Sequence, residues 1–573
     1  MTTGGTIRRG DQLALLAFAV PVQALYMLFP MLIECDAAMF LNYGRFFTTG
    51  SGLYPIRPPG FPLFLALTAL PFDSLMPVMV LHAAMGVAMP ILIYRILAPF
   101  HRPIAVVAAM ANIASTLPFV SAKMLLADQL FVFLLVASMY SLSRLYWTQQ
   151  SRHVYGAVLL AFAAWLTRWE GMFFVAAVAT MVFWFHPTRL RLRPLAKALG
   201  VGVAVALTWS VVRAAELKDY SLVGSVSNGT GLQLMHRAYL DIPHLLLDWE
   251  TLVLRRRSPS DTTDLIRPSG TADLGIRIID PANGPSSARL RALIEQETRE
   301  HPDRLLALRS GMDSAYQGPD SQRVDVYREL VGRFEGDPVG FSGNFFAQPS
   351  NFILDFMWHR LQERFGLAYV DALYRNVAVE GLLRHPLALQ VSAADVLTFF
   401  GLNLRNIVLN DGSSRLLGRM RSSYAETPFN IASCAKDALS QGMWAEYQRD
   451  WKLTDIAVVG RLMEWGDFHG RNVVQLGLGL LALGTWWVLP FSSHRRFFLL
   501  LPCVALVMMG TTAIAVGGAW GSRYEGATHP FVLVSVAGAL ITIQAWLSTG
   551  ARLLFRRLGG TDRLAKRPWG TPE

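Results

Sequence analysis

The chain has 573 residues, of which 53% are hydrophobic and 16% are charged, and its mean hydropathy is +0.34. This composition excludes a soluble multidomain protein and predicts an all-α polytopic membrane protein. The net charge of +11 would suggest nucleic-acid binding in a soluble protein. Here the cytoplasmic flanks of membrane spans account for it, so no nucleic-acid partner is expected.

Apolar stretches long enough to cross a bilayer recur along the chain. A spanning helix needs about 20 mostly apolar residues. The first stretch is not expected to be a cleaved signal peptide, because acidic residues follow it at once and no small-x-small site is present. The sequence predicts about ten spans, near 12–33, 77–98, 103–119, 124–146, 153–167, 170–186, 197–215, 473–491, 496–518 and 527–549.

Lysine and arginine are concentrated in alternate connections, which indicates the orientation of the spans. The connections on the side of the N-terminus are rich in arginine, and both termini are therefore predicted to be cytoplasmic. The high arginine usage and the overall composition of the sequence suggest the cytoplasmic (inner) membrane of a bacterium. The short outer connections carry only Arg45, Arg57, Lys123, Arg168 and Arg523.

Three regions follow from this topology. Residues 1–215 form a module of seven spans with an outer loop at 34–76, and residues 471–573 form a module of three spans with a basic cytoplasmic tail. Between them, 216–470 contains 32 of the 41 acidic residues and is predicted to be an extracytoplasmic domain. Apolar periodicity on both sides of Arg384-His385-Pro386 predicts two amphipathic helices at the outer membrane surface. The alternative is one or two further membrane-embedded helices within 340–410.

The most informative stretch is IECDAAMFLNYGRFFTTGSGLYPIRPPGFPLFLALTALP, residues 33–71. Asp36 follows the first span and either caps a helix at 37–47 or serves as a catalytic base, with Glu34 as its nearest competitor. Tyr43 lies two turns along the same helix face, where it either contacts substrate or packs at the membrane interface. Further on, Tyr54 and Arg57 belong to the loop, and the prolines after Arg57 restrict its backbone.

Other outer charges lie at the ends of apolar helices. In SAKMLLADQLFVFL, Lys123 precedes Asp128, and a carboxylate at that depth is costly unless it is paired or functional. Lys123 or Arg168 is the expected partner of Asp128. In LTRWEGMFF, Arg168 and Glu170 either form an internal ion pair or contribute to function.

A third outer segment, GSRYEGATHPFVLV, opens the last predicted span. It places Arg523 and Tyr524 at the membrane surface. An arginine there is suited to a lipid phosphate, because its guanidinium can donate two parallel hydrogen bonds, and the alternative is an anchor for the helix end.

These segments resemble motifs of the GT-C superfamily, the membrane glycosyltransferases that include protein mannosyltransferases and aminoarabinose transferases. Residues 33–71 resemble the first outer loop of those enzymes, TRWEG resembles their Thr-Arg-Pro-Glu-Gly signature with Trp169 in place of proline, and Arg523-Tyr524 resembles an Arg-Tyr pair before the last span. Relatives often carry Asp-Glu where this chain has Asp36-Ala37.

The resemblance implies a GT-C fold and inverting transfer of a sugar from a polyprenyl phosphate to a glycan, lipid or protein at the outer membrane face. No cofactor is implied and no divalent metal is indicated. Asp36 would be the base, with Glu34 as a second acid. The implied phosphate-binding residues are Arg57, Lys123, Arg168 and Arg523, and the implied substrate-binding residues are Tyr43, Tyr54, Asp128, Glu170 and Tyr524.

Two other classes fit the same composition. A transporter or flippase of lipid-linked saccharides would line a path with intramembrane charges, but the unusual charges here gather at one face. A non-catalytic subunit of an envelope-assembly complex would use the large outer region as an interaction surface. The resemblance favours the glycosyltransferase.

Overall fold

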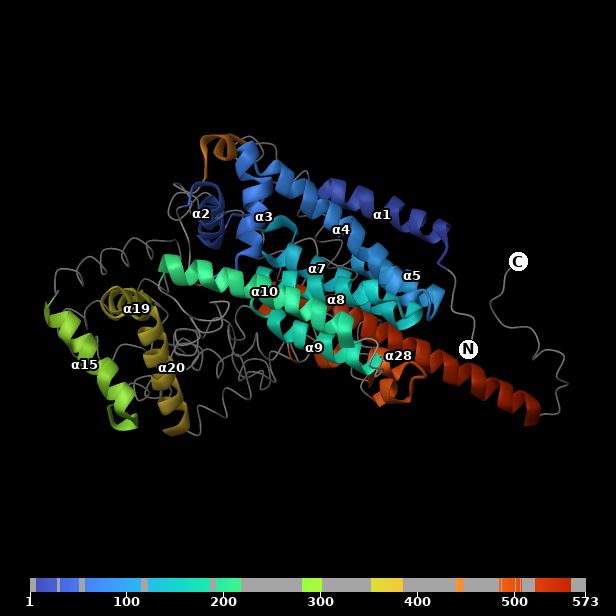
Figure 1. Cartoon of the computed structure of the whole chain (residues 1–573). Coiled ribbons are helices and arrows are strands. Elements are labelled where there is room, and N and C mark those ends of the chain that lie inside the picture. The colour runs from blue at the N-terminus through green and yellow to red at the C-terminus, as the bar shows by residue number, and fades with distance from the viewer. Residues whose placement is uncertain are drawn as a thin grey trace, which may run out of the picture.

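The computed structural model describes a helical membrane protein whose helices lie side by side (Figure 1). The main helices are α1 (Arg9–Met27), α4 (Met76–Leu97), α5 (Arg102–Ala114), α7 (Asp128–Thr148), α8 (Ser151–Thr167), α9 (Gly171–Phe185), α10 (Leu192–Leu217) and α28 (Gly521–Arg557). The residues described by the structure are 7–27, 31–33, 35–50, 57–114, 122–185, 192–217, 281–300, 352–384, 439–446, 484–485, 487–499, 501–504, 507 and 521–557.

Each of the first seven predicted spans contains a helix. Within the described residues, four helices are long and apolar enough to cross a membrane: Met76–Leu97, Asp128–Thr148, Leu192–Ala215 and His529–Ala551. Shorter apolar helices occur at Arg102–Ala114 and Gly171–Phe185. The predicted spans at 473–491 and 496–518 lie largely outside the described residues, so the total of ten stays a prediction.

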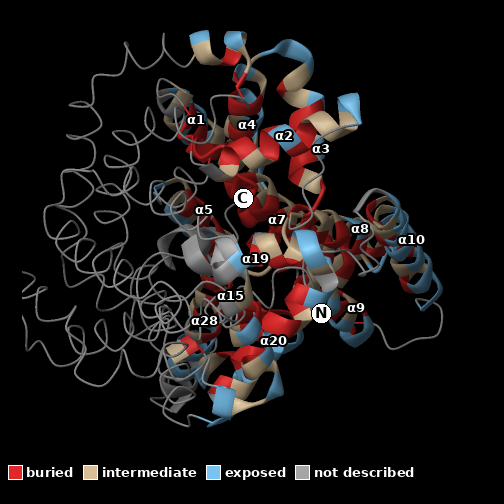
Figure 2. Ribbon diagram, turned by 90° about the vertical axis from the view of Figure 1, so that its left-hand side faces the viewer, coloured by how far each residue is buried: buried red, intermediate tan, exposed pale blue. Residues whose placement is uncertain are grey.

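The core of the bundle is a continuous apolar cluster between these helices. Close helix approach depends on glycine at two contacts: a Cβ added to Gly202 of α10 would lie 2.3 Å from the Phe162 ring, and one added to Gly538 of α28 would lie 2.5 Å from the Phe498 ring. Buried residues face inward, whereas α10 shows an exposed side (Figure 2). Helices that carry hydrophobic residues on both sides suit a bilayer, because lipid covers the outer side.

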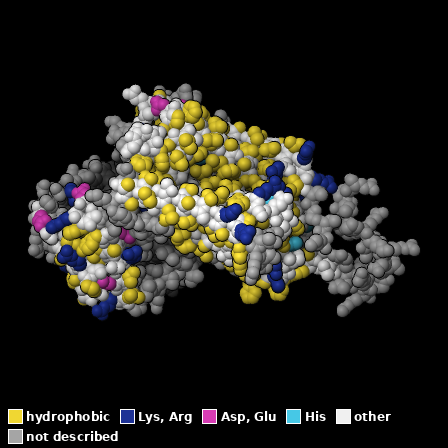
Figure 3. Space-filling model, viewed as in Figure 1, with side chains coloured by type: hydrophobic (Ala, Val, Ile, Leu, Met, Phe, Trp, Pro, Cys, Tyr) yellow, Lys and Arg dark blue, Asp and Glu magenta, His cyan; other side chains and the backbone are white. Residues whose placement is uncertain are grey.

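The outward surface is strongly apolar. Leu13, Val107, Phe183 and Val211 are each more than half exposed. Hydrophobic side chains cover the bundle, and lysines and arginines gather toward the end at which α1 begins (Figure 3). α28 ends at that same end (Figure 1). This segregation is consistent with the predicted orientation.

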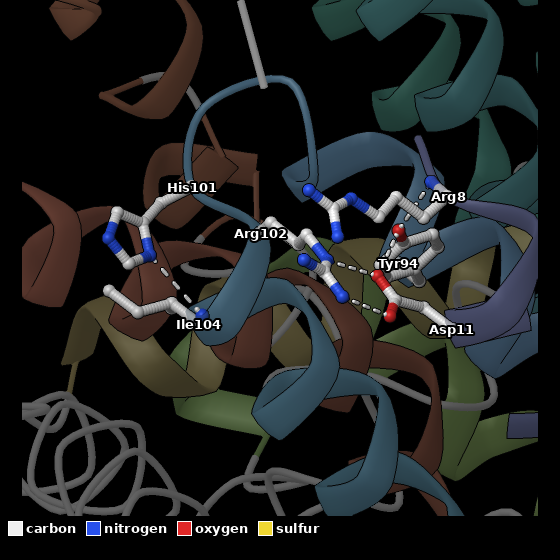
Figure 4. Close-up of polar contacts among 6 residues, drawn as sticks. All are labelled: Arg8, Asp11, Tyr94, His101, Arg102 and Ile104. Atoms are coloured by element: carbon white, nitrogen blue, oxygen red, sulfur yellow. Dashed lines mark hydrogen bonds and ion pairs between the residues drawn. The ribbon is translucent and has the colours of Figure 1, made fainter. Parts of the chain in front are cut away.

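Polar contacts join α1, α4 and α5 at this cationic end (Figure 4). Arg102 donates two hydrogen bonds to the Asp11 carboxylate, at 2.6 and 2.7 Å, and the Tyr94 hydroxyl donates a third at 2.7 Å. Asp11 precedes the first predicted span. Its hydrogen bond with Arg102, and secondarily that with Tyr94, lowers the Asp11 pKa from 3.8 to about 2 despite opposing desolvation.

We expect Asp11→Asn to lower the thermal stability at neutral pH, because it removes a charge-assisted contact between three helices. A carboxyl whose pKa is lower in the folded state contributes stability above its unfolded pKa and loses that contribution as the pH falls through the folded value. The difference in unfolding temperature between wild type and variant should therefore shrink between pH 3.8 and about 2. Thermal unfolding in detergent across this range measures it. Glu363→Gln, an exposed carboxylate of a surface ion pair, is the control and should change little.

The long connection contains α15 (Pro285–Glu300), α19 (Phe352–Phe365) and α20 (Leu367–Arg384). α20 covers the apolar periodicity before Arg384, and the predicted break at His385-Pro386 lies outside the described residues. The Glu380 carboxylate accepts hydrogen bonds from the backbone N–H groups of Ser286 and Ser287, at 3.0 and 2.8 Å. Burial acts to raise the Glu380 pKa, but these N–H groups outweigh it and lower the pKa. Glu380 thus ties α20 to the start of α15, and the predicted second amphipathic helix lies outside the described residues.

A later piece of the connection, residues 439–446, packs on the opposite end of the bundle from the cationic end. Leu439 and Met443 are buried in an apolar cluster with residues of α2 (Cys35–Thr49) and α3 (Gly60–Thr68). The Glu446 carboxylate accepts hydrogen bonds from the Ser74 hydroxyl at 2.6 Å and from the Leu75 N–H at 3.1 Å. Glu446 therefore satisfies a backbone donor at the start of α4.

Glu446→Ala should release residues 439–446 from the bundle, because it leaves the Leu75 N–H without its carboxylate. Loss of hydrogen bonds to a charged group costs about 1.5–3 kcal/mol. Hydrogen exchange followed by mass spectrometry should show faster exchange in peptides covering 439–446 and 74–79. Gln441→Ala, at an exposed position of the same segment, is the matched control. Equal exchange in Glu446→Ala and wild type would show that the apolar contacts suffice.

Candidate active site

Two segments at the α2–α3 end of the bundle are joined through their backbones. Leu32 forms an isolated parallel β-bridge with Met124. The Leu32 N–H donates to the Lys123 carbonyl at 2.8 Å, and the Leu125 N–H donates to the Leu32 carbonyl at 3.1 Å. The residues just before Asp36 are thereby held beside the segment that carries Lys123.

Asp36 lies in the first turn of α2, where it forms an ion pair with Arg57. The helix begins at Cys35, so Asp36 is inside it and not at the N-cap of a helix starting at residue 37. Asp36 Oδ2 lies 3.1 Å from an Arg57 guanidinium nitrogen, and the two side chains are 25% and 33% exposed. The guanidinium also lies over the Phe40 ring, 5.5 Å from its centroid. The predicted base and one predicted phosphate-binding cation are therefore in direct contact.

The Pro-Pro-Gly turn brings this pair toward the end of α8. α3 begins at Gly60 and follows Pro59. A Cβ at position 60 would lie 2.7 Å from the Leu166 carbonyl oxygen and 2.9 Å from the Thr167 hydroxyl. Only glycine permits such an approach of two backbones. The first outer loop is thus packed against the residue that precedes Arg168.

Arg168 lies between two buried carboxylates. Its guanidinium forms an ion pair with Asp128 at the start of α7, and it contacts Glu170 through Nη2 at 2.8 Å and Nε at 3.4 Å. The exposed fractions are 11% for Arg168, 5% for Asp128 and 4% for Glu170. The guanidinium also lies 5.5 Å from the Phe131 ring centroid. Arg168, one of the two partners expected for Asp128, therefore pairs with it.

Lys123, in the segment directly before α7, is a fourth buried charge at this end. Its side chain is only 3% exposed. The positive charges of Lys123 and Arg168 equal the negative charges of Asp128 and Glu170, so the formal charge of the group is zero. Burying charges is costly unless they are paired and hydrogen-bonded. The two cations therefore offset the two carboxylates, which lowers the cost of burying all four charges.

Tyr43 lies on the inner side of α2 against α10. It is fully buried, and its ring stacks on Phe47 at 6.0 Å and lies 6.1 Å from the Trp209 ring. Burial raises the Tyr43 pKa, and the positive charge of Arg213 acts in the opposite direction. Tyr43 therefore remains a neutral hydroxyl near a buried cation.

Arg213 was missed by the sequence reasoning. It is 1% exposed at the C-terminal end of α10, one turn beyond Trp209. The sequence feature that could have identified Arg213 is its position inside the predicted span 197–215, because ionisable residues within membrane spans usually mark a functional site. It adds a cation to this end of the bundle.

For four predicted site residues the structure does not describe the position of the side chain. Glu34 and Tyr54 lie outside the described residues. Arg523 and Tyr524 lie in the first turn of α28, but the structure does not describe their side chains. Within the described part of the chain, no three His, Cys, Asp or Glu side chains are grouped so that they could hold a metal ion.

The fold and this site define a class: an all-α membrane protein with a cluster of buried and half-buried charges at one end of its bundle. Residues 56–213 match the family model of the dolichyl-phosphate-mannose-protein mannosyltransferases. This match supports a GT-C superfamily glycosyltransferase, as the sequence motifs predicted. Arg57, Lys123, Asp128, Arg168 and Glu170 all lie within the matched range. Comparisons with curated proteins and with solved structures found no match.

Arg168→Met should strongly destabilise the protein, because it removes the guanidinium that pairs with both Asp128 and Glu170 and leaves more buried negative than positive charge. Breaking a buried ion pair from one side costs about 3–5 kcal/mol. The triple variant Arg168→Met, Asp128→Asn, Glu170→Gln removes all three charges and should recover much of the loss. Thermal unfolding in detergent compares them. Equal unfolding temperatures for the single variant and wild type would contradict a structural need for Arg168.

Proposed function

We propose that the protein transfers a sugar from a polyprenyl phosphate to a glycan, lipid or protein acceptor at the outer face of a bacterial cytoplasmic membrane. The single observation that carries this proposal is the contact between Asp36 and Arg57. This contact combines a carboxylate that can act as a base toward a hydroxyl with a guanidinium cation that can bind a phosphate. The family match supports the reaction class.

The proposed chemistry needs a base and cations but no general acid, because the leaving group is a phosphate. The acceptor oxygen attacks the anomeric carbon from the side opposite the phosphate, and the bond between that carbon and the phosphate oxygen breaks. The departing polyprenyl phosphate keeps the bonding electrons, and the proton of the acceptor hydroxyl passes to the Asp36 carboxylate. One displacement of this kind inverts the anomeric configuration.

Cations at the same end would stabilise the charge that develops on the leaving phosphate. Arg57 is the most exposed of the placed candidates and Lys123 the most buried. Arg168 already contacts Asp128 and Glu170. It would therefore hold the site together and contribute positive electrostatic potential, without direct contact with the phosphate. Arg523 is a further proposed contact, with Tyr43, Tyr54 and Tyr524 toward the sugar or acceptor.

The apolar surroundings suit a lipid-linked donor. The exposed hydrophobic side chains of the bundle allow a polyprenyl chain to lie against the protein within the bilayer while its phosphate reaches the charged end. Electrostatic contacts are stronger there than in water, because the local dielectric is low.

We expect Asp36→Asn to abolish most of the sugar transfer while the donor still binds. Loss of a general base typically costs 10²- to 10⁴-fold in rate. Purified wild type and variant in nanodiscs would be compared with a panel of radiolabelled polyprenyl-phosphate monosaccharides and membrane-extract acceptors. Asp73→Asn is the control, because it removes an exposed carboxylate elsewhere in the same outer region.

Normal transfer by Asp36→Asn would exclude Asp36 as the base and leave it a helix-terminus charge. Transfer by neither protein, with every donor of the panel shown to bind, would contradict the proposed reaction and favour the transport class.

A further inference from the structure

His82 of α4 is buried beside the segment that carries Lys123. The residue is 1% exposed, and its ring lies nearly parallel to the Phe64 ring of α3, with centroids 6.0 Å apart and planes 6° apart. Neither the sequence motifs nor the family match gives this histidine a role. It nevertheless contacts three of the elements that build the candidate site.

The polar contacts of His82 define its tautomer. Nδ1 lies 3.0 Å from the Ala122 carbonyl oxygen. A carbonyl can only accept a hydrogen bond, so the Nδ1 atom must carry the proton. The backbone carbonyl of His82 in turn accepts a hydrogen bond from the Gln129 amide at 3.2 Å. His82 is therefore a donor to the 122–125 segment and an acceptor from α7.

This segment carries a candidate phosphate-binding cation and borders the candidate base. Lys123 follows Ala122 directly, and its own carbonyl accepts the hydrogen bond from the Leu32 N–H. Leu32 lies four residues before Asp36. A shift of the Ala122 carbonyl would therefore move the Lys123 backbone and, through the β-bridge, the entry to α2.

We propose that His82 is a positioning residue: by holding the Ala122 carbonyl it sets the place of the Lys123 ammonium relative to Asp36. This inference rests on the proposed function. His82 does not touch the substrate, and it acts through Lys123. A buried lysine on a flexible four-carbon stem gains a defined position mainly from a fixed backbone, which is the contribution that His82 makes.

The test compares His82→Leu with His82→Asn in the full-length protein in nanodiscs. Asn keeps an N–H donor close to the place of Nδ1, whereas Leu removes it. A misplacement of about 1 Å in a catalytic site can cost about 100-fold in rate. We expect His82→Leu to lower kcat/KM for the donor by about 10- to 100-fold, and His82→Asn to keep most of it.

The link to Lys123 is tested in a double-mutant cycle with Lys123→Met. If His82 acts through Lys123, His82→Leu should add less than about twofold in the Lys123→Met background, because residues that act on one interaction are not additive. An equal fall in both backgrounds would overturn the proposal. So would equal impairment of the Leu and Asn variants.

Hydrogen exchange supplies a readout that does not need transfer. Peptides covering 31–33 and 122–126 should exchange faster in His82→Leu than in wild type, and at the wild-type rate in His82→Asn. Unchanged exchange in His82→Leu would overturn the positioning role even if transfer fell. A wild-type protein that transfers no sugar would contradict the proposed function, while the exchange experiment would still decide whether His82 holds the two segments.

Discussion

The need to balance buried charge inside an apolar bundle is the constraint on which the site depends. The guanidinium of Arg168 lies between Asp128 and Glu170, and all three side chains are nearly inaccessible. Through this group the start of α7 is joined to the turn between α8 and α9. The Gly60 contact then joins the first outer loop to the end of α8, directly before this turn. The positions of Asp36 and Arg57 follow from this framework.

The charges divide into two sets with different exposure. Arg168, Asp128 and Glu170 are paired within the protein and almost closed to solvent, whereas Asp36 and Arg57 are partly open. An open ion pair can be exchanged for contacts with a ligand at low cost, because part of its charge is already solvated. A closed one cannot, since removing either partner leaves an uncompensated charge. We therefore propose that the open pair, Asp36 and Arg57, serves in recognition and that the closed group, Arg168, Asp128 and Glu170, serves as the scaffold.

Sequence patterns predicted the helices well because membrane spans are defined by local composition. The seven apolar stretches before residue 216 each contain a helix. The Asp128–Arg168 pair was predictable as one of two options, because an intramembrane carboxylate requires a cation. The contacts of Glu446 with Ser74 and Leu75, and of His82 with Ala122, could not be predicted, because no local pattern encodes a partner so distant in the chain. Arg213 was predictable as a residue of interest, because it is an ionisable side chain inside the predicted span 197–215.

The contact between Glu446 and Leu75 also bears on the order in which the protein assembles. The two residues are 371 positions apart. Most of the chain is therefore synthesised before Leu75 can form its hydrogen bond with the Glu446 carboxylate. Contacts at such separation form late, because closing a long loop costs entropy before any contact compensates it. The α2–α3 end of the bundle is therefore completed only after residue 446 has been made, and a nascent chain that stops before it lacks the carboxylate that binds the Ser74 hydroxyl and the Leu75 N–H.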